Sequence, residues 1–260
     1  MIFMKGSVIM EKYFSINQLG CSIRCKMYYN DLKSIKKVAI SVHGFGSNKD
    51  TGSAERFAEY VLKKHKDVVI VTYDEPNHGD DAKRKLSLED CFTYLSIVTE
   101  YVKSRFKTDE IYAYGTSFGG YQLLNYIDKF GSPFRKIALR CPAINLYDIV
   151  TGFITDPDDI KALSRNKPIL VGFEKNVRID NSFLDELKAI DLFEKDFGNF
   201  KNDIKIIQGT KDEYVPFDVV KSFAEKKSIP FVAVEGADHR FRDPKKMDIA
   251  LKEIVELFGF

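Results

Sequence analysis

Short apolar runs alternate with longer helical patterns through most of this 260-residue chain. Runs rich in β-branched residues predict strands at 37–43, 68–73, 111–114, 136–140, 204–208 and 231–235. Apolar residues at helical spacing predict helices near 54–62, 88–102, 118–130, 217–227 and 245–258. Such alternation requires crossover connections, and these build a parallel sheet covered by helices on both faces. We therefore predict an α/β fold with a mostly parallel central sheet of about eight strands.

Two stretches depart from this alternation. Residues 8–17 and 22–30 read as strands with no helix between them, so we expect an antiparallel hairpin at one edge of the sheet. Residues 142–200 are too many for a simple crossover, and they contain a possible two-strand element at 169–173 and 175–179. We predict a core formed by residues 1–141 and 201–260, with 142–200 inserted as a cap over the strand ends.

Composition excludes several classes of protein. The chain has 40 Lys and Arg against 38 Asp and Glu, which argues against nucleic acid as a partner. No apolar run approaches the roughly 20 residues that cross a bilayer, so we expect no membrane span. We expect no signal peptide. Four scattered cysteines without a second pair or a nearby histidine predict reduced thiols in the cytoplasm rather than disulfides or zinc. The oligomeric state is left open.

The most informative motif is the hexapeptide from Gly115 to Gly120, which contains a G-x-S-x-G pattern. Chance alone gives such a match in roughly one of ten chains of this length, so a bystander serine in a glycine-rich turn is the alternative. Its position between a predicted strand and a predicted helix favours Ser117 as a nucleophile, because a reactive serine must project from a tight strand-to-helix turn. Backbone N–H groups at the start of that helix would face negative charge developing beside the serine.

A serine nucleophile needs a base and an acid that orients the base. Hydrolases with this motif carry nucleophile, acid and histidine in that chain order, and His239 is the only histidine after Ser117. Asp212 follows the predicted strand at 204–208, so we expect it to accept a hydrogen bond from His239. Glu213 is the second choice for this acid, whereas Asp238 is too close to His239 in the chain to orient it well.

An oxyanion hole is expected after the first parallel strand, where His43-Gly44-Phe45-Gly46 stands. The backbone N–H groups of Phe45 and Phe118 would be its two donors. We expect His43 to support this loop by hydrogen bonding rather than to react.

The motifs HGFG, GTSFGG, GTKDEYVP and EGADH each follow a predicted strand, and in this order they resemble the α/β-hydrolase superfamily across residues 37–260. Within it the chain is most similar to small bacterial feruloyl- and cinnamoyl-esterases and to monoacylglycerol-lipase-like enzymes. The resemblance implies an acyl-enzyme mechanism at Ser117 on a small-molecule ester, with no metal or organic cofactor.

The substrate is less constrained than the mechanism. Phe45, His78, Tyr147 and Phe173 are candidate pocket residues, although aromatic residues of a cap more often form its own core. We predict a carboxylesterase for small or aromatic-acid esters. The alternatives are another serine acyl hydrolase (a thioesterase, a monoacylglycerol lipase or a small peptidase) and a non-catalytic ligand-binding member of the fold.

Overall fold

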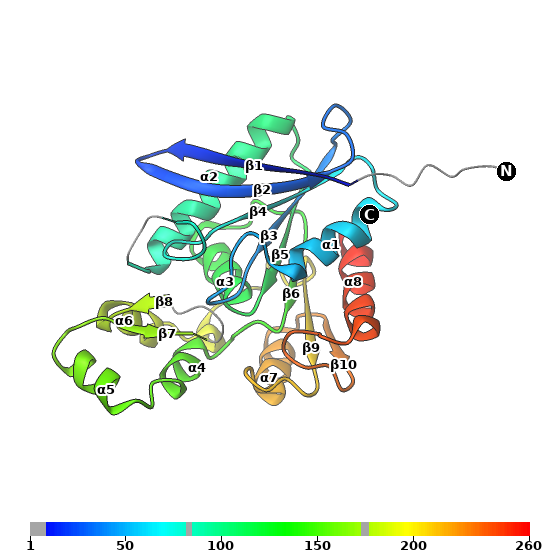
Figure 1. Cartoon of the computed structure of the whole chain (residues 1–260). Helices are drawn as coiled ribbons and strands as arrows, with labels where there is room; N and C mark the ends of the chain where they lie inside the picture. Colours follow the sequence, from blue (N-terminus) through cyan, green and yellow to red (C-terminus); the bar gives the residue numbers. More distant parts are fainter. Residues whose placement is uncertain (1–8, 82–84, 173–176) are drawn as a thin grey trace.

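A computed structural model describes residues 9–81, 85–172 and 177–260 and contains an eight-stranded sheet in the order β1-β2-β4-β3-β5-β6-β9-β10 (Figure 1). Its strands are β1 (Met10–Gln18), β2 (Cys21–Tyr29), β3 (Lys37–Val42), β4 (Val68–Tyr73), β5 (Ile111–Thr116), β6 (Ile137–Arg140), β9 (Ile204–Gly209) and β10 (Phe231–Val234). From β4 to β10 neighbouring strands are parallel, whereas β1 and β2 form the antiparallel edge. The predicted α/β fold and its edge hairpin are confirmed.

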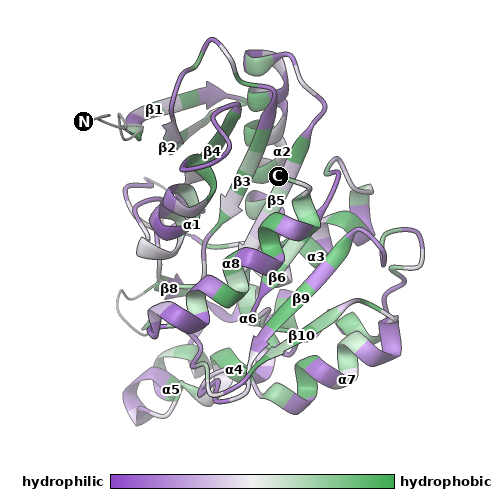
Figure 2. Ribbon diagram, turned by 90° about the vertical axis from the view of Figure 1, so that its right-hand side faces the viewer, coloured by the Kyte–Doolittle hydropathy of each residue, from purple (hydrophilic) through white to green (hydrophobic). Residues whose placement is uncertain are grey.

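The helices form a layer on each face of the sheet. The buried side chains of α1 (Gly52–Leu62) and α8 (Pro244–Phe258) belong to one apolar cluster. Those of α2 (Leu88–Phe106), α3 (Phe118–Phe130) and α7 (Phe217–Lys227) belong to the other. Hydrophilic and hydrophobic residues alternate along α7 and α8, as expected for helices that bury one side only (Figure 2).

Burial follows each strand's place in the sheet. All six residues of β4 are buried, and its sequence Val-Val-Ile-Val-Thr-Tyr is almost entirely β-branched or aromatic. A strand covered by helices on both faces requires this composition. Most of β1, in contrast, is exposed, because this strand forms the edge.

Residues 142–172 and 177–200 lie together at one end of the molecule (Figure 1). They contain α4 (Leu146–Gly152), α5 (Pro157–Ser164), β7 (Ile169–Val171), β8 (Val177–Ile179), α6 (Asn181–Lys188) and a 3-10 helix, η1 (Leu192–Glu194). The pair β7–β8 is antiparallel and separate from the main sheet. The division into core and inserted cap stays a prediction. Among the described residues, no helix combines the length and apolar character needed to span a membrane.

Candidate active site

Ser117 stands in the turn between β5 and α3. Its backbone has φ 52° and ψ −114°, a conformation that non-glycine residues rarely adopt. The turn is held on both sides, because the Ser117 N–H donates to the Arg140 carbonyl at 3.0 Å and its own carbonyl accepts from the Ala143 N–H at 3.2 Å. The surrounding hydrogen bonds thus hold the serine at the start of α3 in a strained geometry.

The glycines of this turn are required by close backbone contacts. A Cβ atom on Gly119 would lie 2.3 Å from the carbonyl oxygen of Val42, so only glycine lets α3 approach the end of β3. A Cβ atom on Gly44 would lie 3.3 Å from the Ser117 Cβ. The loop after β3 and the turn after β5 are therefore packed backbone against backbone.

His239 and Asp212 come from two different loops and form a hydrogen-bonded pair. His239 lies between β10 and α8, and Asp212 lies in the turn after β9. The His239 Nδ1 is 2.9 Å and 3.0 Å from the two Asp212 carboxylate oxygens. Because a carboxylate only accepts, Nδ1 carries a hydrogen, and Nε2 is left as an acceptor when the ring is neutral.

The Asp212 carboxylate is fully enclosed, with none of its side chain exposed. It also accepts from the Gln208 side chain at 2.9 Å and from the backbone N–H groups of Tyr214 and Val215 at 2.9 and 2.8 Å. Burial raises the pKa of Asp212, but the hydrogen bonds from His239 and from the two backbone groups outweigh burial, and the net pKa lies below its usual value. Asp212 is thus ionised at neutral pH.

Ser117, His239 and Phe45 line one cavity of about 240 Å³ at the carboxyl ends of the strands. In the described part of the chain, neither the Phe45 N–H nor the Phe118 N–H donates to a protein acceptor. The two amides expected to form an oxyanion hole therefore remain available for a ligand.

His43 supports the loop that carries Phe45. Its Nδ1 lies 2.8 Å from the Gly44 carbonyl, and its Nε2 accepts from the Glu75 N–H at 3.2 Å. Complete burial lowers the pKa of His43 to about 4, so the ring is neutral at pH 7. A neutral ring can both donate and accept, and it links the loop after β3 to the loop after β4.

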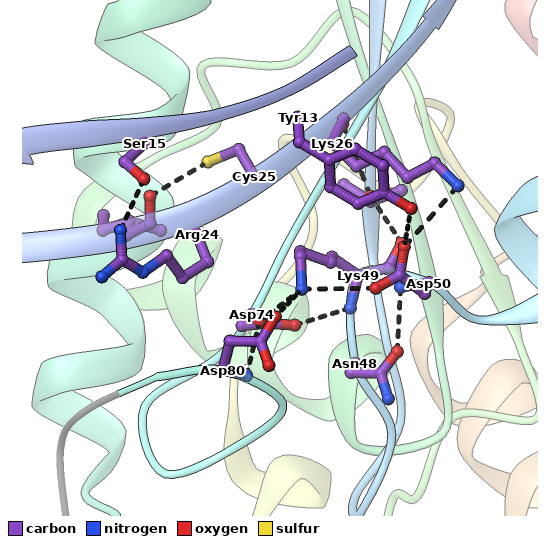
Figure 3. A network of polar contacts seen from close by, with 12 residues as sticks. Tyr13, Ser15, Arg24, Cys25, Lys26, Asn48, Lys49, Asp50, Asp74 and Asp80 are labelled. Atoms are coloured by element: carbon purple, nitrogen blue, oxygen red, sulfur yellow. Dashed lines mark hydrogen bonds and ion pairs between the residues drawn. The ribbon is translucent and has the colours of Figure 1, made fainter. Parts of the chain in front are cut away.

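An ion-pair network centred on the buried Lys49 anchors the far end of the same loop (Figure 3). The Lys49 ammonium lies 3.1 Å from Asp74, 3.2 Å from Asp50 and 2.5 Å from Asp80. The Tyr13 hydroxyl of β1 donates to Asp50 at 2.8 Å. The edge hairpin is thereby connected to the loop that runs from β3 to α1.

Comparison with known proteins agrees with this architecture. Residues 40–212 match the family model described as the alpha/beta hydrolase fold. This chain belongs to that family. No curated protein matches the chain.

Among solved structures, the chain is similar to Est1E from Butyrivibrio proteoclasticus in its ferulic acid complex, with TM-score 0.74, 16% identity, and 95% of this chain and 100% of that one covered. It is also similar to mouse alpha/beta hydrolase domain-containing protein 10, with TM-score 0.71, 16% identity, and 96% and 98% covered. A third similar structure is an alpha-beta serine hydrolase homologue from Coxiella burnetii, with TM-score 0.61, 17% identity, and 96% and 98% covered. At these identities the likeness concerns the fold.

The candidate pocket residues have different positions in this hydrolase-family fold. Phe45 lines the cavity that holds Ser117. His78 packs behind it, with its ring 5.7 Å from that of Phe45 and stacked 6.2 Å from that of Phe118. Tyr147 lines a second cavity, of about 610 Å³, between α4 and α7. Phe173 lies outside the described residues.

The structure adds cavity residues that the motifs do not reveal. Arg140 at the end of β6, together with Thr51 and Ser53 at the start of α1, lines the cavity beside Ser117. The sequence contains one indication that Arg140 lines the cavity: it stands at the carboxyl end of the predicted strand that follows the proposed nucleophile in the chain.

One group of side chains has the spacing of a metal site. The donor atoms of Cys141, Asp212 and His239 lie within 4.8 Å of one another. Burial raises the pKa of the Cys141 thiol well above its usual value, and Nδ1 of His239 is already engaged by the carboxylate. A protonated thiol and an occupied imidazole nitrogen fit a metal ion poorly.

Proposed function

We propose that this protein is a serine carboxylesterase for small or aromatic-acid esters, with Ser117 as nucleophile, His239 as base and Asp212 as the acid that orients the base. The observation that carries the proposal is the pairing of His239 Nδ1 with Asp212 at 2.9 Å, in a loop that brings His239 to the cavity lined by Ser117. Acyl transfer to serine needs a hydroxyl, an imidazole and a carboxylate close together, and this pairing beside the cavity supports such an arrangement.

The reaction follows from the roles of these groups. The Ser117 Oγ bonds to the ester carbonyl carbon while Nε2 of His239 takes the hydroxyl proton, and Asp212 stabilises the resulting imidazolium. The oxyanion of the tetrahedral intermediate accepts hydrogen bonds from the Phe45 and Phe118 amides. His239 then returns the proton to the departing alcohol oxygen as the C–O bond breaks. Water repeats both steps and releases the acid.

Support for aromatic-acid esters comes from the similar fold of Est1E, whose solved structure holds ferulic acid. Support for small esters comes from the modest volume of the cavity, about 240 Å³. The chain contains no other histidine after Ser117, so the base has no substitute downstream.

The test combines covalent labelling with a substrate panel. A fluorophosphonate probe is expected to label the folded protein at Ser117, as located by peptide mass spectrometry, and Ser117→Ala is expected to abolish labelling and turnover. Ser104→Ala is the matched control, because Ser104 is exposed in α2 and does not line this cavity. Folded protein that stays unlabelled would contradict a serine mechanism.

The panel contains p-nitrophenyl esters, methyl cinnamates, acyl thioesters and aminoacyl amides. A higher kcat/KM for the oxygen esters than for the thioesters and amides supports the carboxylesterase function. Turnover of thioesters or amides alone would instead identify another serine acyl hydrolase.

A further inference from the structure

The cavity beside Ser117 has a cationic lining. Two of its residues are arginines, Arg140 and Arg240, and none of its described lining residues is an aspartate or a glutamate. Side-chain hydroxyl groups make up much of the rest, from Ser47, Thr51, Ser53, Thr116 and Tyr214. Such a surface favours a ligand with negative charge and acceptor oxygens.

Arg140 is buried without a counterion. Only 5% of the residue is exposed, and no described carboxylate forms an ion pair with it. Its guanidinium packs over the ring of Phe241 at 5.2 Å. A buried charge without a partner is unfavourable, so an anionic ligand would relieve a cost that this fold already carries.

The guanidinium of Arg140 has donor groups that no described residue uses. Nη1 faces the Arg240 carbonyl and the Met247 sulfur, each at 3.5 Å. Nε is buried and has no acceptor among the described residues, and Nη2 forms no hydrogen bond there either. Nε–H and Nη2–H lie on the same side of a guanidinium, and together they bind the two oxygens of a carboxylate.

Arg140 is also next to the candidate nucleophile. Arg140 pairs with Thr116 in the parallel ladder of β5 and β6. The Arg140 carbonyl accepts a hydrogen bond from the Ser117 N–H at 3.0 Å. Both residues line the same cavity. A substrate whose ester group lies at Ser117 would therefore place a second group close to Arg140.

We propose that Arg140 forms a subsite for an anionic group of the substrate. The substrate is then an ester bearing a second, negatively charged group, such as the monoester of a dicarboxylic acid. This inference rests on the proposed esterase function and narrows its substrate class. The charged group pairs with the Arg140 guanidinium while the ester carbonyl lies at Ser117.

The test measures the ratio of kcat/KM for charged and neutral esters. Mono-p-nitrophenyl glutarate carries its charge on the acyl part and is compared with p-nitrophenyl butyrate. 4-(Butyryloxy)benzoate carries its charge on the alcohol part and is compared with phenyl butyrate. We expect one charged ester to be preferred by at least about tenfold over its neutral partner, and the preference to weaken with added salt.

Arg140→Met is expected to remove this preference, and Arg140→Lys to retain part of it because the charge remains without the planar fork. Arg105→Met is the matched control, since Arg105 is exposed in the last turn of α2. The Lys variant keeps the test available if the Met variant does not fold.

Three results would overturn the subsite. One is equal turnover of charged and neutral esters, and another is an unchanged preference in Arg140→Met. The third is an equal loss on all esters in Arg140→Met, which indicates that Arg140 only positions the His239 loop through the Arg240 carbonyl.

Absence of all turnover and of fluorophosphonate labelling would instead overturn the esterase function. The subsite is then tested by calorimetric titration of monomethyl glutarate into Ser117→Ala, with and without Arg140→Met. Binding that Arg140→Met abolishes supports the subsite, and no binding to either protein refutes it.

Discussion

Replacing Asp212 by asparagine changes one atom of the candidate active site and makes a sharp prediction. The Asp212 Oδ1 accepts from the Tyr214 and Val215 N–H groups at 2.9 and 2.8 Å. Two backbone donors require an acceptor, so the asparagine oxygen is expected to stay there. Its NH₂ group would then take the place of Oδ2, which now lies 2.9 Å from Nδ1 of His239.

This exchange reverses the hydrogen bond to His239. An NH₂ group donates, so Nδ1 must accept, and the ring hydrogen moves to Nε2. A protonated Nε2 cannot take the hydroxyl proton of Ser117. The loss of the correct tautomer and of the carboxylate charge is expected to lower kcat by about 10⁴-fold, or about 5 kcal/mol of transition-state stabilisation. The melting temperature should fall only modestly, because the side chain keeps its shape and its bonds to the two backbone N–H groups and loses the one now accepted from Gln208 at 2.9 Å.

The assay is the initial rate on the best p-nitrophenyl ester, with circular dichroism to verify folding. Asp238→Asn is the matched control, since the Asp238 carboxylate faces the Arg242 N–H at 2.9 Å and its guanidinium at 2.8 Å rather than the ring. We expect this control to stay within about threefold of the wild-type rate. A folded Asp212→Asn variant with more than about a tenth of the wild-type kcat would refute the tautomer reasoning.

Three other perturbations test the structure around the site. Lys49→Met leaves the fully buried Asp74 without its ammonium partner, and urea unfolding is expected to show a loss of about 3–5 kcal/mol. Gly119→Ala places a Cβ 2.3 Å from a carbonyl oxygen of β3 and is expected to give insoluble or strongly destabilised protein, whereas Gly152→Ala has open space and should behave as wild type. Burial lowers the pKa of His78 to about 3, so its stabilising effect is present above about pH 6.5 and is lost as the pH falls. Between pH 6.5 and 4.5, His78→Asn is expected to lose about 3 kcal/mol less unfolding free energy than wild type; an equal loss would contradict the assignment.

The sheet was predictable because local pattern and tertiary environment agree. The run of six apolar and β-branched residues at 68–73 has no polar face to expose, so it can only be a strand covered on both sides. The hairpin at the edge was equally readable, because nothing between its two strands could form a crossover helix. The cap was harder to predict. Its elements are short, so their patterns say little about how they pack.

The choice of Ser117, Asp212 and His239 also came from the sequence, because each residue follows a predicted strand and parallel strands end at one edge. The contact between Asp212 and His239 did not, since 27 residues separate them and the path of two loops decides their distance. His78 and Tyr147 show the opposite case. Both are aromatic residues on segments that follow strands, but in the fold the ring of His78 lies behind Phe45, and Tyr147, in α4, lines a second cavity.

The order of motifs along the chain thus determined the family, the sheet and the choice of proposed reacting groups, since these depend on residue type and on position relative to strand ends. Arg140 marks what only the tertiary structure decided. An arginine at a strand end is ordinarily a solvated surface residue. No local pattern reports that it is 5% exposed, has no carboxylate partner among the described residues and lines the cavity of Ser117. Burial and charge pairing are sums over neighbours from distant segments, and those neighbours meet only when the chain is folded.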